Sequence, residues 1–213
     1  MSEECDKIHQ WANSLKRVRF PFDNEEIPKN GIYILFEEGE FSHGKDKIAR
    51  IGTHTGQDQL RSRLKQHFIN ENKDRSIFRK NIGRCILNKN KDPFLKLWEI
   101  DLTTQKAKKE FSKLVDKNKL KEIEKQVTSY LQNHFTFAVI NVQNKEDRLK
   151  LESKLISTIS LCKDCKPSPK WLGLHSPKEK IKQSGLWLVN ELYKEPLTSA
   201  ELSNLKIYSE SSA

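Results

Sequence analysis

The hydrophobic pattern between residues 30 and 68 predicts two strands followed by a helix. Two short apolar runs, 31–36 and 47–52, are rich in β-branched and aromatic residues and are bounded by Gly and Asn, which is typical of a hairpin. The helix should begin near Gln57 or Asp58, with Asp58 as its cap or first-turn anion. Its apolar stripe consists of Leu60, Leu64 and Phe68.

Other segments extend this pattern into a domain. Residues 3–17 have helical apolar spacing and should brace the core, and residues 136–142 form the clearest strand, the third of the sheet. A helix should follow over residues 145–161. Weaker patterns indicate a strand or buried turn at 92–102, helices at 104–135, 177–183 and 198–207, and a strand-like run at 184–189. We therefore expect an α+β fold, with a small three-stranded antiparallel sheet flanked by helices and with helical insertions.

Length and charge narrow the classes of function. The 213 residues are enough for one domain with a buried core, yet only 35% of them are hydrophobic. The formal net charge is +10, from 39 basic and 29 acidic residues, and this excess favours a nucleic acid as partner. No apolar run reaches the length of a membrane span, and the acidic start is unlike a signal sequence. We therefore expect a cytoplasmic protein with reduced cysteines and no membrane partner.

Three polar side chains should converge beside the sheet. Side chains alternate along a strand, so Tyr33 points away from Ile32 and Ile34. Arg63 and His67 are four residues apart and therefore neighbours on the predicted helix, beside its apolar stripe. A phenol, a guanidinium and an imidazole at one rim suit the handling of a phosphodiester.

One carboxylate lies on the apolar side of the helix predicted over 145–161. At about 100° per residue, the leucines and isoleucines of this helix fill one arc, and Glu152 falls inside it. A buried carboxylate is costly unless it is paired or binds a metal. Glu152 is therefore either the ion-pair partner of Arg148, four residues away, or a ligand of a divalent metal.

Cysteine and histidine positions leave alternatives open. Cys162 and Cys165 have metal-ligand spacing, but zinc usually needs two more ligands and no second pair follows. Cys5, His9 or Cys85 could complete such a site, although we expect structural thiols in preference to zinc. Two further histidines lie outside this set: His54, after the second strand, is either an active-site or a plain turn residue, and His43, in the hairpin loop, should be solvated or face nucleic acid.

The ordered set of motifs resembles the GIY-YIG nuclease superfamily. Gly31-Ile32-Tyr33, Arg50-Ile51-Gly52 and the segment from Arg63 to Phe68, with its Arg-x-x-x-His pair, carry the resemblance. Arg50 stands where the family's name has its second tyrosine. The resemblance covers about residues 29–84 and resumes near residue 145, where Leu151-Glu152-x-x-Leu155-Ile156 is similar to the family's metal-binding glutamate segment. The family often has an asparagine after this glutamate, but Lys170 holds the nearest candidate position, so no asparagine is assigned.

This resemblance implies a metal-dependent DNA endonuclease that hydrolyses phosphodiester bonds by in-line attack of activated water. Glu152 would hold Mg²⁺ or Mn²⁺, and Arg63 would neutralise the charge that develops on phosphorus. Tyr33 would position or deprotonate the water, helped by positive charge from Arg50 and His67. We count His54 among the catalytic candidates. The alternatives are a catalytically inactive DNA-binding module of the same fold, and a structural protein.

The remaining expectations concern DNA contacts and organisation. Residues 1–28 should form an N-terminal helical brace and residues 29–161 the GIY-YIG-like core, with a Lys-rich helical insert at about 89–133 and a C-terminal extension at 162–213. A homodimer would favour symmetric cutting of both strands. The basic residues expected on the DNA backbone are Lys47, Arg61, Lys65, Arg75, Arg79 and Lys80.

Overall fold

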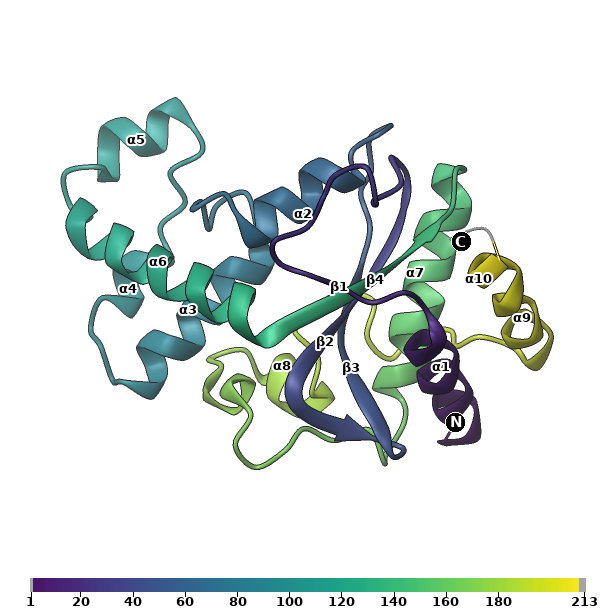
Figure 1. Ribbon diagram of the computed structural model, residues 1–213. Coiled ribbons are helices and arrows are strands. Elements are labelled where there is room, and N and C mark those ends of the chain that lie inside the picture. Colours follow the sequence, from purple (N-terminus) through teal and green to yellow (C-terminus); the bar gives the residue numbers. More distant parts are fainter. Residues whose placement is uncertain (1, 211–213) are drawn as a thin grey trace.

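A four-stranded antiparallel sheet in the order β1-β4-β2-β3 lies at the centre of the protein (Figure 1). The computed structural model describes residues 2–210. The strands are β1 (Val18–Arg19), β2 (Gly31–Ser42), β3 (Lys45–Gly52) and β4 (Phe135–Asn141). The α+β class expected from the sequence is confirmed, and the sheet has one strand more than expected. This strand, β1, has two residues at the sheet edge, too few for a recognisable alternation.

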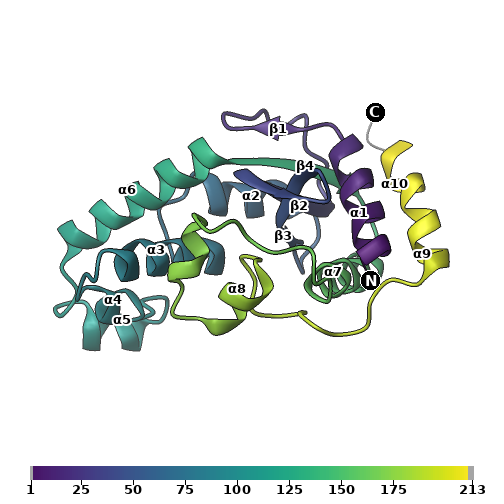
Figure 2. The same ribbon diagram turned by 90° about the horizontal axis from the view of Figure 1, so that it is seen from below.

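Alternation along β2 gives the sheet two different faces. Tyr33 and Leu35 point into one core, which is covered by α2, α3 and α6, whereas Ile32 and Ile34 point into the opposite core, covered by α1 and α7. These helices are α1 (Ser2–Ser14), α2 (Leu60–Phe68), α3 (Ile77–Lys89), α6 (Lys117–His134) and α7 (Lys145–Ser160). Figure 2 shows α6 leading directly into β4, without a loop between the helix and this inner strand of the sheet.

The start of α2 differs from the expectation in its cap. The helix begins at Leu60 with Gln59 at the cap position, and Asp58, two residues before the helix, adopts a positive φ of 56°. Instead, the Asp58 carboxylate accepts a hydrogen bond from the Asn30 side chain (2.6 Å), and the Asp58 N–H donates to the Asn30 side-chain oxygen (2.8 Å). This reciprocal pair fixes the loop before α2 to the residue that precedes β2.

The hairpin between β2 and β3 is longer and tighter than the apolar runs indicate. Both strands continue through the charged segment, and the chain reverses at His43 and Gly44, whose φ values of 53° and 70° are typical of a two-residue turn. In the register, Leu35 pairs with Arg50 but Phe36 pairs with Ile48, so one residue of β3, Ala49, is a bulge.

The remaining segments pack around this core as helices and irregular chain. The segments expected at 92–135 form α4 (Leu95–Trp98), α5 (Gln105–Phe111) and α6, and the C-terminal part contains α8 (Glu179–Ser184), α9 (Ser199–Ser203) and α10 (Ile207–Glu210). The strand-like run at 184–189 is not a strand, and the prediction there is wrong. A single backbone hydrogen bond, from the Trp187 N–H to the Ala49 carbonyl (2.9 Å), joins this run to the β3 bulge.

Among residues 2–210, no helix has the length and apolar character that crossing a membrane requires.

A buried carboxylate connects β2 to the C-terminal segment. Glu37 has only 3% of its surface exposed, and its Oε2 accepts hydrogen bonds of 2.7 Å from the indole N–H groups of both Trp171 and Trp187. The hydroxyl of Tyr130 on α6 donates to the other oxygen. Burial raises the pKa of Glu37, and the three hydrogen bonds oppose that rise. Both tryptophans are buried and anchor the C-terminal segment to the core.

We expect Glu37→Ala to lower the free energy of unfolding by about 3 kcal/mol, because three buried donors lose their acceptor. Glu38→Ala is the matched control, since Glu38 is exposed and makes only a 3.5 Å ion pair with Arg19; it should change stability by less than about 0.5 kcal/mol. Urea denaturation at pH 7 measures both. Equal midpoints for the two variants would contradict the role assigned to Glu37.

Candidate active site

The ring of Tyr33 lies directly over Gly52 of the neighbouring strand. The two residues are paired across β2 and β3, so their side-chain positions share one face of the sheet. A Cβ atom at Gly52 would lie 2.1 Å from the Tyr33 hydroxyl oxygen, which no rotamer adjustment of a packed ring could accommodate. The glycine of the second motif therefore provides the space in which the phenol of the first motif lies.

A chain of hydrogen bonds runs from Tyr33 to the start of α3. The Tyr33 hydroxyl lies 2.8 Å from Nε2 of His67, and Nδ1 of His67 lies 2.7 Å from the hydroxyl of Ser76. Ser76 also caps α3, because its hydroxyl accepts a hydrogen bond from the Arg79 N–H. The helix cap thus fixes the orientation of the imidazole against the phenol.

His67 is neutral in this environment. It is fully buried, and burial lowers its pKa well below the usual value, with Arg63, Arg50 and Arg79 adding to the shift. The expectation that His67 supplies positive charge to Tyr33 is therefore corrected, since a neutral imidazole supplies only a hydrogen bond. The positive charge beside the phenol comes from Arg50 instead.

Arg50 joins the buried phenol to the protein surface. Its Nε lies 3.4 Å from the Tyr33 hydroxyl, and its Nη1 donates to the carbonyl of Trp187. Its guanidinium carbon also lies 5.0 Å from the centre of the Phe78 ring. The β3 bulge at Ala49 lets Arg50 share the face of Tyr33 while Ile48 and Ile51 both face the opposite core.

Glu152 extends from α7 to the end of β3. Its Oε1 accepts a hydrogen bond from the Thr53 N–H (3.0 Å), and burial raises its pKa to about 7, while Arg50 and Arg63 act in the lowering direction. Arg148 is not its partner: that guanidinium donates to the backbone carbonyls of Val142 (3.1 Å) and residue 143 (2.6 Å). The ion-pair explanation for the buried carboxylate therefore does not hold.

A cleft of about 480 Å³ brings the arginines and the carboxylate together. Arg50, Arg63 and Glu152 all line it, and Arg63 also donates to the Arg75 carbonyl (3.1 Å). The cleft therefore combines two guanidinium groups with the carboxylates of Glu152 and Glu191. Tyr33 and His67 lie behind Arg50 and have no exposed surface.

Two asparagines that the sequence interpretation missed also line the cleft. Asn190 follows the irregular run after α8, and Asn81 lies on α3 with its side-chain NH₂ buried and without a hydrogen-bond partner among the described residues. The expected position for an asparagine, Lys170, was chosen by closeness in sequence to Glu152. The only available signal for Asn190 was its residue type, because the loop that returns it to the cleft has no periodic pattern.

His54 does not face the cleft, in contrast to its inclusion among the catalytic candidates. Its Nδ1 donates to the Gly56 carbonyl (2.7 Å), and its Nε2 accepts from the Gly31 N–H (3.3 Å). Burial lowers its pKa, so the neutral form with one donor and one acceptor matches these two partners. His54 orders the loop after β3, and both of its ring nitrogens are used in these hydrogen bonds.

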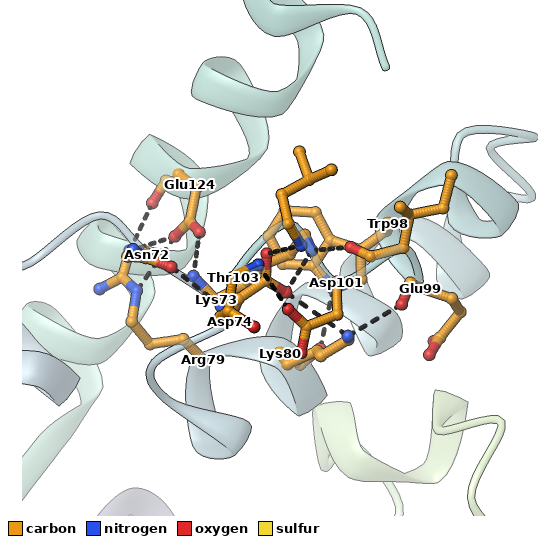
Figure 3. A network of polar contacts seen from close by, with 12 residues as sticks. Asn72, Lys73, Asp74, Arg79, Lys80, Trp98, Glu99, Asp101, Thr103 and Glu124 are labelled. Atoms are coloured by element: carbon orange, nitrogen blue, oxygen red, sulfur yellow. Dashed lines mark hydrogen bonds and ion pairs between the residues drawn. The ribbon is translucent and has the colours of Figure 1, made fainter. Parts of the chain in front are cut away.

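Three of the basic residues expected on DNA are buried within the protein. Lys47 is 1% exposed and donates to the Gly185 carbonyl, Arg79 is fully buried in an ion pair with Glu124 (2.7 Å), and Lys80 donates to the Glu99 carbonyl (2.9 Å). Figure 3 shows Arg79 and Lys80 inside one polar network. These three predictions are wrong, because periodicity cannot separate a solvated basic face from a buried ion-pair network.

The other three basic residues remain accessible. Arg75 is exposed, and Lys65 is partly exposed. Arg61 is also partly exposed, but its Nε donates to the Ile27 carbonyl (2.7 Å), so only part of its guanidinium is available. The surface beside α2 can therefore contact a phosphate backbone through fewer cations than the sequence count implied.

A comparison with protein-family models gives one finding. The model described as the GIY-YIG domain matches residues 5–212, which is nearly the whole chain. No curated protein and no solved structure gives a significant match.

Replacing Arg79 by alanine should lower the free energy of unfolding by about 3–5 kcal/mol, because it leaves the buried Glu124 carboxylate without its cation. Arg75→Ala removes the same charge from the same segment at an exposed position and should change stability by less than about 0.5 kcal/mol. Chemical denaturation monitored by tryptophan fluorescence distinguishes them. A mild effect of Arg79→Ala would restore that residue as a candidate for DNA contact.

Proposed function

Because the chain belongs to the GIY-YIG domain family, we propose that it is a metal-dependent endonuclease that hydrolyses phosphodiester bonds in DNA. The observation that carries this proposal is the cleft in which Arg50 and Arg63 face Glu152, with the hydrogen-bonded phenol of Tyr33 behind Arg50. Two cations attract a phosphodiester, and a carboxylate opposite them provides a site for a divalent cation. The excess of basic residues supports a polyanionic substrate.

Arg63 would neutralise the charge that develops on the attacked phosphate. Its guanidinium lines the cleft and is held by the Gln66 side chain (3.0 Å) and the Arg75 carbonyl (3.1 Å). These two anchors leave further N–H groups for the substrate, since a guanidinium has five. A donor that is already oriented loses little entropy when the transition state forms.

Tyr33 would act as the base that activates the attacking water. The Ser76 hydroxyl accepts from the Arg79 N–H, so its own proton is free to point at Nδ1 of His67. The imidazole proton then lies on Nε2 and points at the phenol oxygen. Together with Arg50, this places two hydrogen-bond donors on that oxygen.

Substrate binding would expose this phenol. Tyr33 has no exposed surface, and Arg50 lies between it and the cleft. A phosphate in the cleft attracts the Arg50 guanidinium more strongly than the neutral Trp187 carbonyl that now accepts its hydrogen bond. Arg50 would therefore turn toward the substrate and leave room for water at the Tyr33 oxygen.

Glu152 fits the role of a ligand for Mg²⁺ or Mn²⁺. Among residues 2–210, one hydrogen bond reaches its carboxylate, at Oε1, and Asn190, whose amide carries a further oxygen, also lines the cleft. Oxygen donors of this kind suit a hard cation that retains several waters. Glu191 is less suitable, because Ser153 and Lys194 occupy its two oxygens. When bound, the cation would stabilise the charge on the phosphate and leaving oxygens.

A catalytically inactive DNA-binding module is the second candidate. Arg50 in place of the second motif tyrosine favours it, because a phenol expected in the family is missing. Both candidates predict DNA binding that weakens steeply with salt. Only the endonuclease predicts cleavage that depends on a divalent cation.

We expect nicking of supercoiled plasmid DNA in Mg²⁺ or Mn²⁺, and a loss of at least about 100-fold in the single variants Glu152→Gln, Arg63→Ala and Tyr33→Phe. Glu146→Gln is the matched control, because Glu146 is an exposed carboxylate on the same helix, α7, and its removal should leave cleavage unchanged. Gel analysis of a panel of plasmids of different sequence measures the rates. Salt-sensitive binding without nicking of any plasmid would support the inactive module instead.

The raised pKa of Glu152 predicts a pH-dependent stability difference. The carboxyl group titrates near pH 7 in the folded chain but has an ordinary value of 4.5, so folding favours its protonated form and wild type loses stability as pH rises between these values. Glu152→Gln lacks this loss. In buffer without divalent cations, its stability advantage should grow by about 1–2 kcal/mol from pH 5 to pH 8, after allowance for solvent screening.

Urea titrations of both proteins at several pH values test this expectation. Adding Mg²⁺ at pH 8 should shrink the difference, because the cation binds the ionised carboxylate of wild type only. A stability difference that is constant with pH would show that Glu152 is ionised throughout.

A further inference from the structure

Three cysteines and a histidine from distant parts of the chain meet on the side of the sheet covered by α1 and α7. Cys162 and Cys165 follow the end of α7, Cys5 lies on α1, and His43 lies at the turn between β2 and β3. The three thiols are all buried. His43 is only partly exposed.

Several ligand atoms of this cluster are close enough to share a metal ion. Nε2 of His43 lies 3.5 Å from Sγ of Cys162, and single ligand atoms of Cys5, His9 and His43 lie within 4.8 Å of one another. The Cys5 thiol also interacts electrostatically with both Cys162 and Cys165. Zinc–sulfur bonds of about 2.3 Å and zinc–nitrogen bonds of about 2.0 Å place sulfur and nitrogen about 3.5 Å apart in a tetrahedron.

His9 lies in the same cluster but is not available as a ligand. Its Nδ1 lies 2.9 Å from the Cys5 carbonyl, to which it donates, and its Nε2 accepts from the Ile48 N–H (3.2 Å). A neutral imidazole has one donor and one acceptor, so both are used. Nε2 of His43 has no such backbone partner, since its contact is with the Cys162 thiol. The thiols of Cys5 and Cys165 contact His9, at 3.6 Å and 3.7 Å, but among the described residues no backbone group binds the side chains of Cys5, Cys162, Cys165 or His43. These four residues therefore form the ligand set.

We propose that Cys5, Cys162, Cys165 and His43 bind one structural zinc ion. Four protein ligands of the Cys₃His type close the coordination sphere, which is the arrangement of structural rather than catalytic zinc sites. None of the four lines the cleft of Arg50 and Glu152. The site is therefore separate from the proposed catalytic cation and differs from it in ligand chemistry.

A buried lysine provides the charge that such a site needs. Three thiolates and a neutral imidazole around Zn²⁺ carry a net charge of −1, which is costly to bury without a counter-charge. Lys47 is 1% exposed and interacts electrostatically with Cys165 and Cys5, as well as with Glu40 and Glu37. The ammonium group of Lys47, which the sequence analysis expected to contact DNA, would thus face the zinc–thiolate group.

The ion would fasten three segments that are distant in the sequence and already pack together in one core. It would link α1, the tip of the β2–β3 hairpin and the turn after α7, where the Ser2 hydroxyl already donates to the Asp164 carboxylate between the two cysteines (2.5 Å). Because the ligands meet only in the folded chain, the free energy of zinc binding becomes free energy of folding. The role of α1 as a brace would then depend on the metal.

The test is the metal content and spectrum of the full-length protein, purified without chelator from cells grown with zinc. Mass spectrometry of the metals should give one zinc per chain in wild type and in the control Cys85→Ser. Cys85 is also a buried thiol, but it lies on α3 in the opposite core. Cys162→Ser and His43→Ala should hold less than about a tenth of that amount, because each removes one ligand.

Cobalt(II) substitution of the wild-type protein gives a readout that requires no variant to fold. Tetrahedral thiolate coordination should produce a thiolate-to-cobalt charge-transfer band and intense visible bands, and zinc should abolish both. Wild type without stoichiometric zinc and without these bands would overturn the proposal, and so would full zinc retention in Cys162→Ser. Full retention in His43→Ala would overturn the assignment of that ligand. None of these measurements uses DNA cleavage, so their outcome is independent of the proposed function.

Discussion

The structure depends on the burial of β2 on both faces and along both edges. A strand with β3 and β4 as neighbours and helices above and below must satisfy every polar group that it carries within the protein. Tyr33 does so through His67 and Arg50, and Glu37 does so through two indoles and a phenol. The need to satisfy buried polar groups therefore fixes the position of Tyr33 near the start of β2. It also fixes the C-terminal segment, which contacts Glu37 further along the strand. Helices α2 and α6 and the segment after α7 are held in place by these polar contacts as well as by apolar packing.

Electrostatics in the candidate site follow from this burial. A fully buried imidazole surrounded by three arginines remains neutral, so His67 orients the phenol and Arg50 supplies the charge. The arginine in place of the second motif tyrosine is thus the charged group that contacts the Tyr33 hydroxyl. Glu152, partly buried in the same cleft, has a pKa that burial raises to about 7, so its ionised form predominates only above that pH unless a cation binds it. The cleft is arranged so that a phosphate and a divalent cation would each relieve one of these unbalanced charges.

The net charge of +10 indicated the class of partner better than it indicated the residues that would contact it. A count of charged residues does not say whether the charged group is exposed or buried. The side chains of Lys47, Arg79 and Lys80 are buried. Each is compensated by groups distant in sequence, such as the Glu124 carboxylate 45 residues after Arg79. Burial of these cations is costly unless the ion pairs are complete, so they define the packing of α3 against its neighbours. The basic surface that remains beside α2 is correspondingly smaller.

The sequence by itself determined the class of fold, the hairpin, the strand over 136–142, the helix over 145–161 and the family, because these rest on local periodicity and on motifs of short, fixed spacing. It also placed Tyr33 and Glu152 on the correct faces of their elements. Only the tertiary structure decided which polar groups meet. The Arg148 guanidinium donates to backbone carbonyls, and His54 makes a hydrogen bond within its own loop. Asn190 lines the cleft, although the segment that carries it has no periodic pattern. The sequence left Cys5, His9 and Cys85 as alternatives beside Cys162 and Cys165, and only the packing of whole elements decided among them, because no local pattern records a contact across 157 residues.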